Sequence, residues 1–317
     1  MLAEEWRWQD ETCISNDQTK FGMTKYSLIP AKIATSFVRD DHYDMLSANA
    51  GTDNPQQTTL FRVLTMPLDQ TLLNHPLISE RYFFPRRDPV AEPLLIEVDG
   101  ATLACRSYRN RPGAKTVVHF HGNGEVAADY QQGFPELFAR LGWNLLLVEY
   151  RGYGGSTGRP QLGRMLTDVD AVLSAAGPPE QLVLFGRSVG SLFAIRGIRH
   201  SAQIAGLILE SGIADVRERL LLRVAPEELG VRPAALDALL ADCFDHQISL
   251  SNYHNPTLVL HTRHDGLVDV SHGERLYQWA GGEKQLKVFP GGDHNSILDR
   301  NAEEYAELVA RFLLPLG

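Results

Sequence analysis

From about residue 81 to the C-terminus, short apolar runs alternate with segments of helical periodicity. The apolar runs are rich in Val, Leu, Ile and Phe, and polar or glycine-rich turns separate them from their neighbours. Near-continuous apolar strands that alternate with helices are typical of a mainly parallel sheet covered by helices on both faces. The pattern predicts strands over 94–98, 102–108, 116–121, 144–150, 181–185, 204–209, 257–261 and 285–289.

The first two predicted strands form a hairpin, because Asp99 and Gly100 between them are a typical tight turn. This hairpin gives the sheet an antiparallel N-terminal edge. Helices are predicted over about 125–141, 161–175 and 191–198. A closing helix carries an apolar face with i, i+3, i+4, i+7 spacing, formed by Tyr305, Leu308, Val309 and Phe312. The expected fold class is therefore α/β.

The sequence Gly-Arg-Ser-Val-Gly at 186–190 lies between a predicted strand and a predicted helix. A strand, Gly-x-Ser-x-Gly and a helix form the context of a nucleophile elbow. The two glycines allow the backbone to turn sharply without Cβ clashes. The pattern thus predicts that Ser188 stands at the tip of this turn with its hydroxyl facing a cleft.

A serine hydroxyl is a weak nucleophile and needs a base, and the base needs a carboxylate that fixes its tautomer. Asp265 comes directly after the strand 257–261, and His294 comes directly after the strand 285–289. Ser188, Asp265 and His294 follow one another in the chain order that this architecture uses. We therefore expect Ser188 as nucleophile, His294 as base and Asp265 as acid.

Other carboxylates and histidines near the predicted strand ends are alternatives for these roles. Asp269 and Glu210 are the rival acids, and Asp265 is preferred because it follows its strand most closely. The remaining histidines near strand ends are expected to be structural or supporting groups: His119, His121, His261 and His264.

Acyl transfer also requires donors for a developing oxyanion. The backbone N–H of Val189 is one candidate, because it lies at the start of the helix after the elbow. The second is the N–H of Asn123, in the Gly-Asn-Gly turn after the strand 116–121. Two such donors lower the barrier by several kcal/mol.

The chain is expected to divide into an N-terminal extension over 1–80, partly disordered or peripheral, and a main domain over 81–317. A connection of more than 40 residues follows the strand 204–209, and its helical patterns predict a small cap over about 213–252. The cap leucines either line an acyl pocket or only pack the cap onto the body: Leu220, Leu221, Leu222, Leu236, Leu239 and Leu240.

Composition excludes several classes of protein. The chain has 317 residues, a formal net charge of −9 and no run of Lys or Arg, so no nucleic-acid partner is expected. Three widely spaced cysteines, Cys13, Cys105 and Cys243, fit a reducing compartment. The sequence shows neither a signal-peptide pattern nor a membrane-spanning apolar stretch, so a cytoplasmic location is expected. Dinucleotide, P-loop and His-Glu-x-x-His motifs are missing, so no cofactor and no metal are expected.

Five segments together resemble the α/β-hydrolase superfamily. Within it they look like the serine hydrolases that include the eukaryotic α/β-hydrolase-domain protein depalmitoylases and many bacterial relatives. The segments are 121–124, 150–156, 186–191, the turn at Asp265, and 292–295. The resemblance covers about 81–317. It implies an α/β-hydrolase fold and esterase or thioesterase chemistry at Ser188, His294 and Asp265.

The expected function is a serine hydrolase that cleaves a small-molecule acyl ester or thioester. The depalmitoylases carry an N-terminal cysteine cluster for lipid anchoring, whereas this N-terminus has only Cys13, so no stable membrane anchor is expected. A peptidase or amidase of the same superfamily and a non-catalytic binding module are the alternatives. Nothing in the sequence sets the oligomeric state.

Overall fold

The computed structural model describes residues 68–317, and most of the predicted extension over 1–80 lies outside this range. The described part of the extension forms a 3-10 helix, η2 (Leu68–Asn74), and a short helix, α1 (Pro76–Tyr82). Leu73 and Ile78 of these elements are fully buried. Residues 71–80 therefore contribute to the core, while the division of the chain at residue 80 remains a prediction.

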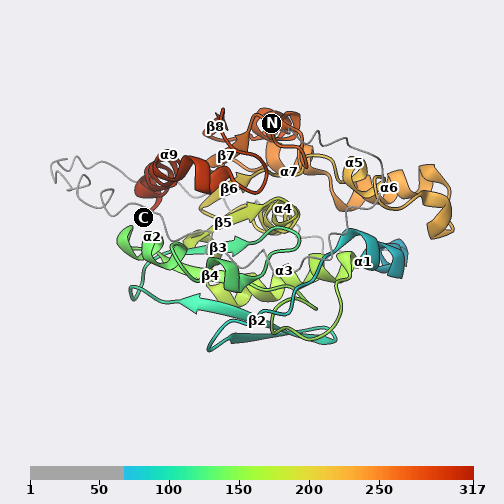
Figure 1. The fold of residues 1–317 in the computed structure, drawn as a ribbon, viewed down its shortest axis with the longest axis horizontal. Coiled ribbons are helices and arrows are strands. Elements are labelled where there is room, and N and C mark those ends of the chain that lie inside the picture. The colour runs from blue at the N-terminus through green and yellow to red at the C-terminus, as the bar shows by residue number, and fades with distance from the viewer. Residues whose placement is uncertain (1–67) are drawn as a thin grey trace, which may run out of the picture.

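One eight-stranded sheet organises the molecule, with the strand order β1-β2-β4-β3-β5-β6-β7-β8 (Figure 1). Strand β2 is antiparallel to both of its neighbours, β1 and β4. The remaining six strands, β3 to β8, are parallel to one another. The strands are β1 (Leu94–Val98), β2 (Ala101–Tyr108), β3 (Thr116–Phe120), β4 (Asn144–Val148), β5 (Leu182–Arg187), β6 (Gly206–Glu210), β7 (Thr257–Thr262) and β8 (Lys284–Phe289). The prediction of a mainly parallel sheet with an antiparallel N-terminal hairpin is confirmed.

Helices cover both faces of this sheet (Figure 1). One face packs against α3 (Leu162–Ala176), α4 (Gly190–His200) and α8 (Val270–Trp279). The other packs against α2 (Phe134–Arg140) and α9 (Ile297–Leu313). The central strands are buried along their whole length, because they carry apolar side chains on both faces.

Local chemistry moves several predicted boundaries. The helix predicted over 125–141 is split into η3 (Ala127–Tyr130) and α2, because Gly133 between them adopts a φ of 87°. Strand β4 ends at Val148 rather than at residue 150. The next residue, Glu149, accepts the backbone N–H of Tyr150 with its own side chain, at 3.1 Å. That bond removes this N–H from the sheet ladder.

The long connection after β6 is helical, as predicted for the cap. It contains α5 (Val216–Leu220), η5 (Pro226–Leu229), α6 (Pro233–Cys243) and α7 (His246–Ser251). Four of its leucines are buried in one cluster with Leu73 and Ile78: Leu220, Leu236, Leu239 and Leu240. Leu222 instead is 66% exposed. These four leucines therefore pack the cap onto the body, where α6 contacts η2.

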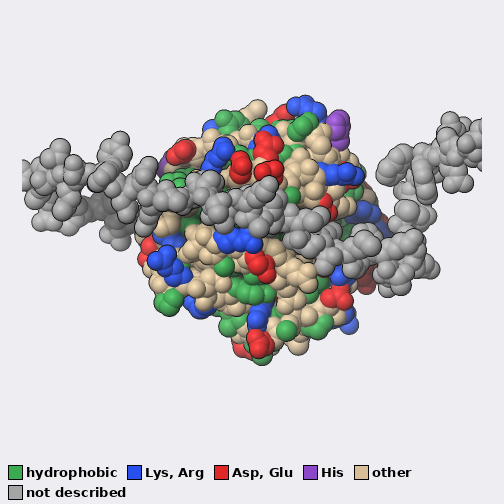
Figure 2. All heavy atoms as spheres, turned by 60° about the vertical axis from the view of Figure 1, so that its left-hand side comes forward, with side chains coloured by type: hydrophobic (Ala, Val, Ile, Leu, Met, Phe, Trp, Pro, Cys, Tyr) green, Lys and Arg blue, Asp and Glu red, His purple; other side chains and the backbone are tan. Residues whose placement is uncertain are grey.

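The surface is mixed in charge. On the face that Figure 2 shows, Lys and Arg side chains are interspersed with Asp and Glu side chains over the described residues. Among the helices of residues 68–317, none is long and apolar enough to cross a membrane.

Candidate active site

The elbow at the end of β5 has the strained geometry that its sequence predicts. Ser188 adopts a φ of 51°, which only a few per cent of residues other than glycine do. A Cβ at Gly186 would lie 2.6 Å from the carbonyl oxygen of Gly190, and a Cβ at Gly190 would lie 2.1 Å from that of Phe120. The two glycines are therefore required where β5, α4 and the end of β3 meet, which brings the elbow next to the loop after β3.

Three side chains form a hydrogen-bonded row at the carboxyl ends of the parallel strands. The Nε2 atom of His294 lies 2.9 Å from the Oγ of Ser188, and its Nδ1 lies 2.7 Å from an oxygen of Asp265. An ionised carboxylate only accepts hydrogen bonds, so Nδ1 carries the proton. Nε2 is then free to accept the serine proton. All three residues are buried, and Ser188 keeps 7% of its surface exposed.

Asp265 is bound through both of its oxygens. One accepts the backbone N–H groups of Leu267 and Val268, at 2.9 and 2.7 Å, and the other faces His294. Burial alone would raise the pKa of Asp265, but hydrogen bonds from His261 and His294 and from the backbone hold it well below its ordinary value. These hydrogen bonds therefore favour the ionised form of Asp265.

His261 supports the acid from the end of β7. Its Nε2 lies 2.8 Å from the carbonyl oxygen of Val268 and 3.4 Å from an oxygen of Asp265. A Cβ at Gly273 would lie 2.6 Å from its Nδ1, so the ring fits tightly against α8. The sequence predicted a structural or supporting role for His261, and its contacts are with the loop that carries the acid.

The loop after β3, which carries Asn123, begins beside the elbow, since a Cβ at Gly190 would lie 2.8 Å from the carbonyl oxygen of His121. Within residues 68–317, neither this N–H nor that of Val189 donates to another protein group. The carbonyl of Gly122, in the same peptide unit as the Asn123 N–H, accepts from Nδ1 of His121 at 2.8 Å and from the N–H of Glu125 at 3.3 Å. The orientation of this peptide is thus fixed from its carbonyl side.

A buried ion pair holds that loop. His121 and Glu149 are both buried, with Nε2 and Oε1 at 2.9 Å. Burial alone would lower the pKa of His121, but the hydrogen bond and charge of Glu149 outweigh it and raise the pKa. Because both ring nitrogens face acceptors, the imidazolium is the form that satisfies both bonds. Sequence reasoning placed His121 only among the structural histidines and did not identify Glu149, which lies 28 residues away.

The rival residues have other roles. Asp269 caps α8 by accepting the N–H of Ser271 at 2.9 Å. Glu210 binds Nε of Arg187 at 2.9 Å and accepts the hydroxyl of Tyr305. His119 packs at an angle against the rings of Tyr130 and Phe185, and burial lowers its pKa to about 3, so it is neutral. None of these side chains is hydrogen-bonded to the serine or to the histidine ring in the part of the chain that the structure describes.

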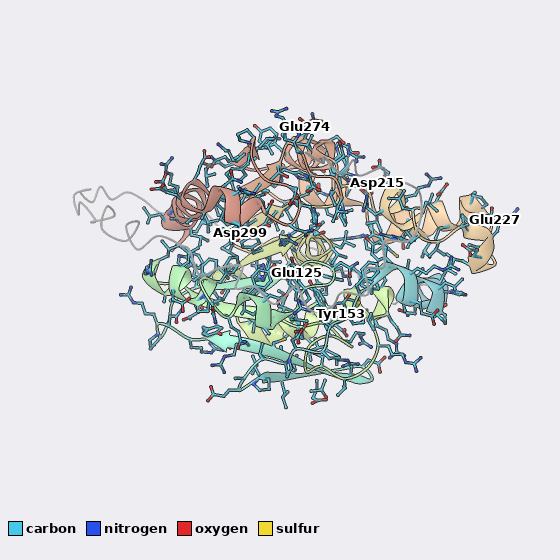
Figure 3. All side chains as sticks on the ribbon, viewed as in Figure 1. Glu125, Tyr153, Asp215, Glu227, Glu274 and Asp299 are labelled. Atoms are coloured by element: carbon cyan, nitrogen blue, oxygen red, sulfur yellow. The ribbon has the colours of Figure 1, made fainter. Side chains whose placement is uncertain are left out.

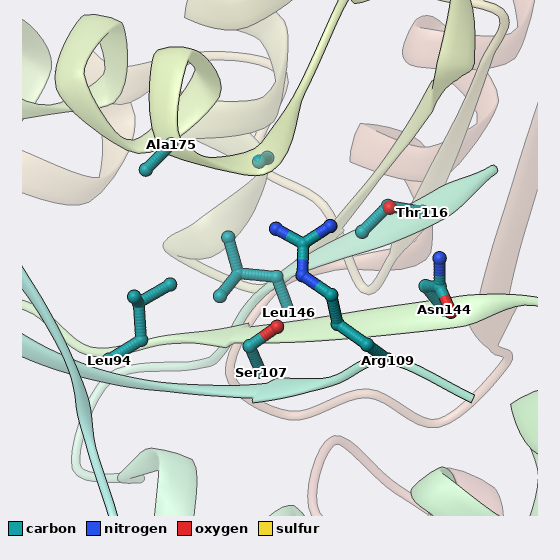
Figure 4. Close-up of a pocket in the computed structure, with 8 residues that line it drawn as sticks. Leu94, Ser107, Arg109, Thr116, Asn144, Leu146 and Ala175 are labelled. Atoms are coloured by element: carbon teal, nitrogen blue, oxygen red, sulfur yellow. The ribbon is translucent and has the colours of Figure 1, made fainter. Parts of the chain in front are cut away.

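A recess at the opposite end of the sheet is separate from this site. It is lined by Thr116 and Asn144, the first residues of β3 and β4, and by Arg109, whose side chain stands in the middle of the close-up (Figure 4). Ser188 follows the other end of its strand, so the recess has no part in chemistry at the serine. Within residues 68–317, no group of three or more His, Cys, Asp or Glu side chains is arranged to hold a metal ion.

Comparison with known sequences finds hydrolases. Residues 111–236 match the family described as Serine aminopeptidase, S33. Alpha/beta hydrolase domain-containing protein 17C of Xenopus tropicalis is 28% identical over 221 residues, which are 67% of this chain and 65% of that protein. The uncharacterized protein YfhR of Escherichia coli O157:H7 is 28% identical over 210 residues, 63% of this chain and 70% of the relative. The match to the frog protein therefore covers slightly less than two thirds of its length.

Solved structures share the fold. The esterase Pf2001 of Pyrococcus furiosus superimposes with a TM-score of 0.57 at 21% identity, over 74% of this chain and 99% of that one. The esterase RhEst1 of Rhodococcus sp. ECU1013 gives a TM-score of 0.53 at 23% identity, over 70% and 98%. With its eight-stranded sheet and helical layers, the chain has the α/β-hydrolase fold of these solved esterases, and its sequence is similar to α/β-hydrolase domain-containing proteins.

Proposed function

We propose that the protein is a serine hydrolase that cleaves a carboxylic ester or thioester through an acyl-enzyme on Ser188. The observation that carries this proposal is the continuous row from Ser188 Oγ through the His294 ring to Asp265, with separations of 2.9 and 2.7 Å. The strained backbone at Ser188 supports the same conclusion, because strain of this kind clusters at functional sites.

In the first half-reaction, Nε2 of His294 takes the hydroxyl proton while Oγ of Ser188 attacks the substrate carbonyl carbon. The carbonyl oxygen becomes an oxyanion, which the N–H groups of Asn123 and Val189 stabilise. The bond to the leaving group then breaks, and His294 gives its proton to the departing oxygen or sulfur. Asp265 stabilises the imidazolium throughout.

In the second half-reaction, water replaces the leaving group. His294 removes one proton from the water, whose oxygen attacks the acyl carbon, and the same two N–H groups hold the second oxyanion. Collapse of this intermediate breaks the bond to Ser188, and the proton on His294 returns to Oγ. The products are a carboxylic acid and an alcohol or thiol.

A fluorophosphonate probe tests the nucleophile. The wild-type protein is expected to form a covalent adduct at Ser188, and Ser188→Ala is expected to form none. Asn123 and Val189 contribute only backbone N–H groups, so side-chain substitutions there are poor tests of the same step. Labelling that persists in Ser188→Ala would overturn the assignment, and a wild-type protein that is never labelled would favour a non-catalytic binding module.

A peptidase or amidase is the second candidate. The observation that favours it is the match of residues 111–236 to a family described as serine aminopeptidases. The esterase names of the two structural neighbours favour ester cleavage instead. Rates on acyl p-nitrophenyl esters and on aminoacyl anilides separate the two, and faster cleavage of the anilides would replace our assignment.

We further propose that the enzyme works in the cytoplasm on small-molecule substrates. The supporting observation is that Cys105, buried in the core, is a free thiol. Fractionation of cells that express the tagged full-length chain tests this location. Recovery in the membrane fraction would contradict it.

A further inference from the structure

Arg187 is a buried cation directly before the candidate nucleophile. It is the last residue of β5, and only 5% of its side chain is exposed. A buried charge is costly unless it is paired and hydrogen-bonded. The hydrogen-bond partners of this guanidinium therefore indicate the role of Arg187.

Three nitrogens of Arg187 bind three different parts of the site. Nε lies 2.9 Å from Oε1 of Glu210, at the end of β6, and Nη1 lies 2.6 Å from Oε1 of Glu125, in the loop after β3. Nη2 donates to the backbone carbonyl of His294 at 2.7 Å. One side chain thus links the elbow to the loop of the base and to the loop of the oxyanion donor.

The contact on the oxyanion side reaches Gly122, the residue directly before the candidate donor Asn123. Oε2 of Glu125 accepts the N–H of Gly122 at 2.7 Å and the hydroxyl of Tyr130 at 2.5 Å. A Cβ at Gly122 would lie 2.5 Å from Nη1 of Arg187, so the loop lies directly on the guanidinium. Figure 3 places Glu125 in the middle of the molecule, whereas Glu227 lies at its rim. The peptide unit between His121 and Gly122 is therefore anchored to Arg187 through Glu125, and the next peptide unit carries the Asn123 N–H.

The contact on the base side reaches the histidine backbone. The carbonyl of His294 belongs to the residue whose ring must stay within hydrogen-bond distance of Ser188. Glu210, the second carboxylate on Arg187, also accepts the hydroxyl of Tyr305 from α9. Burial raises the pKa of Glu210, while the charge of Arg187 opposes that shift.

We propose that Arg187 is a positioning residue that sets the distance between the base and the oxyanion donors. Its buried guanidinium is bonded to protein groups, so it acts through Glu125 and through the His294 backbone. The inference rests on the proposed function. It predicts that a change at Arg187 lowers the rate of chemistry more than it lowers substrate binding.

Arg187→Lys is the test variant, because lysine keeps the charge but lacks the planar fork that reaches three acceptors at once. Arg151→Lys is the matched control. Arg151 is also buried and binds Asp168 at 2.6 and 2.7 Å, but its other contact is with the carbonyl of Asp99 in the hairpin turn. Both variants break a buried pair, and only one of the pairs touches the site.

The first readout is kcat and KM per competent site, with sites counted by fluorophosphonate titration. For Arg187→Lys we expect kcat to fall by about 10- to 100-fold with KM nearly unchanged, since a displacement of about 1 Å has effects of that order. For Arg151→Lys we expect a lower thermal midpoint and an unchanged kcat per site. The proposal would be overturned if kcat per site fell equally in the two variants, or if kcat were unchanged in Arg187→Lys.

The second readout needs no substrate. The proton between His294 and Asp265 gives a far-downfield resonance in proton NMR when the pair is held in place. We expect it in the wild type and in Arg151→Lys, and expect it weakened or shifted in Arg187→Lys. If Arg187→Lys does not fold, Glu125→Gln is measured in its place. Glutamine keeps the shape of Glu125, the partner of Arg187, but removes its charge. An unchanged resonance in the folded variant contradicts the positioning role, whereas a wild type that is never labelled contradicts the proposed function instead.

Discussion

Replacing Asp265 by asparagine changes one atom and tests how the acid acts. In the wild type, one oxygen of Asp265 accepts two backbone N–H groups, from Leu267 and Val268, and the other accepts Nδ1–H of His294. Asparagine has one oxygen and one NH2 group, so it satisfies only one of these two sides. The structure decides which side that is.

The two backbone donors hold the amide oxygen on their side. Turning the amide around would break two hydrogen bonds of about 1 kcal/mol each and would bring donors against donors. A difference of about 2 kcal/mol already leaves only roughly 3% of molecules in the turned form. The NH2 group of the asparagine therefore faces His294.

A donor beside Nδ1 forces the histidine into the wrong tautomer. Nδ1 then accepts from the asparagine, and Nε2 carries the proton and points it at Ser188. The ring is no longer able to take the serine proton. We expect kcat to fall by about 10⁴-fold, as it does when the acid of a Ser-His-Asp triad becomes asparagine. This loss corresponds to about 5.4 kcal/mol of transition-state stabilisation.

The assay is steady-state cleavage of a short-chain p-nitrophenyl ester, with the folded fraction checked by circular dichroism. Asp269→Asn is the matched control, because Asp269 is the rival acid and an asparagine in its place still caps α8. We expect the control to keep kcat within about twofold of the wild type, as is usual for a surface change. Asp265→Asn with more than about a tenth of wild-type kcat would refute the tautomer argument.

Three further predictions concern stability. Gly190→Ala would put a Cβ 2.1 Å from the carbonyl of Phe120 and is expected to prevent folding or to lower the urea midpoint strongly; a midpoint equal to that of the wild type would show that the elbow can shift. Leu236→Ala should cost about 2–5 kcal/mol in the free energy of unfolding, because this leucine of α6 is fully buried in the core cluster, and denaturant titration measures the loss. The raised pKa of His121 stabilises the fold below its unfolded pKa of about 6.5, and this contribution is lost as the pH rises through the raised folded value. The stability difference between the wild type and His121→Gln should therefore shrink toward alkaline pH, and a constant difference would contradict a charged His121.

Local patterns were enough to predict the main elements of the fold. Apolar runs marked every strand of the parallel sheet, and the Asp-Gly turn marked the hairpin. Failures came where short-range chemistry overrides periodicity, as at Gly133, which splits a predicted helix. The helix α7 has only six residues, too few for a period to be recognised.

The three residues of the candidate triad are far apart in the sequence, but the topology of a parallel sheet predicts that they lie close together. The carboxyl ends of parallel strands meet at one edge of the sheet, so residues 106 positions apart, such as Ser188 and His294, come together if each directly follows its strand. That their side chains form one hydrogen-bonded row is a finding of the structure. Their catalytic roles remain a proposal that the probe experiment tests.

The sequence by itself determined the succession of strands and helices along the chain and the sharp turn at Ser188, because both depend on local pattern. It also determined the three residues expected to act together, because each directly follows a predicted strand. Only the tertiary structure decided how those residues are held. Arg187 meets Glu210 and the His294 backbone across 23 and 107 positions, and His121 meets Glu149 across 28. Such long-range pairs leave no periodic pattern in the sequence. A charged side chain needs a partner only when the fold buries it, so the tertiary structure decides which charges are paired.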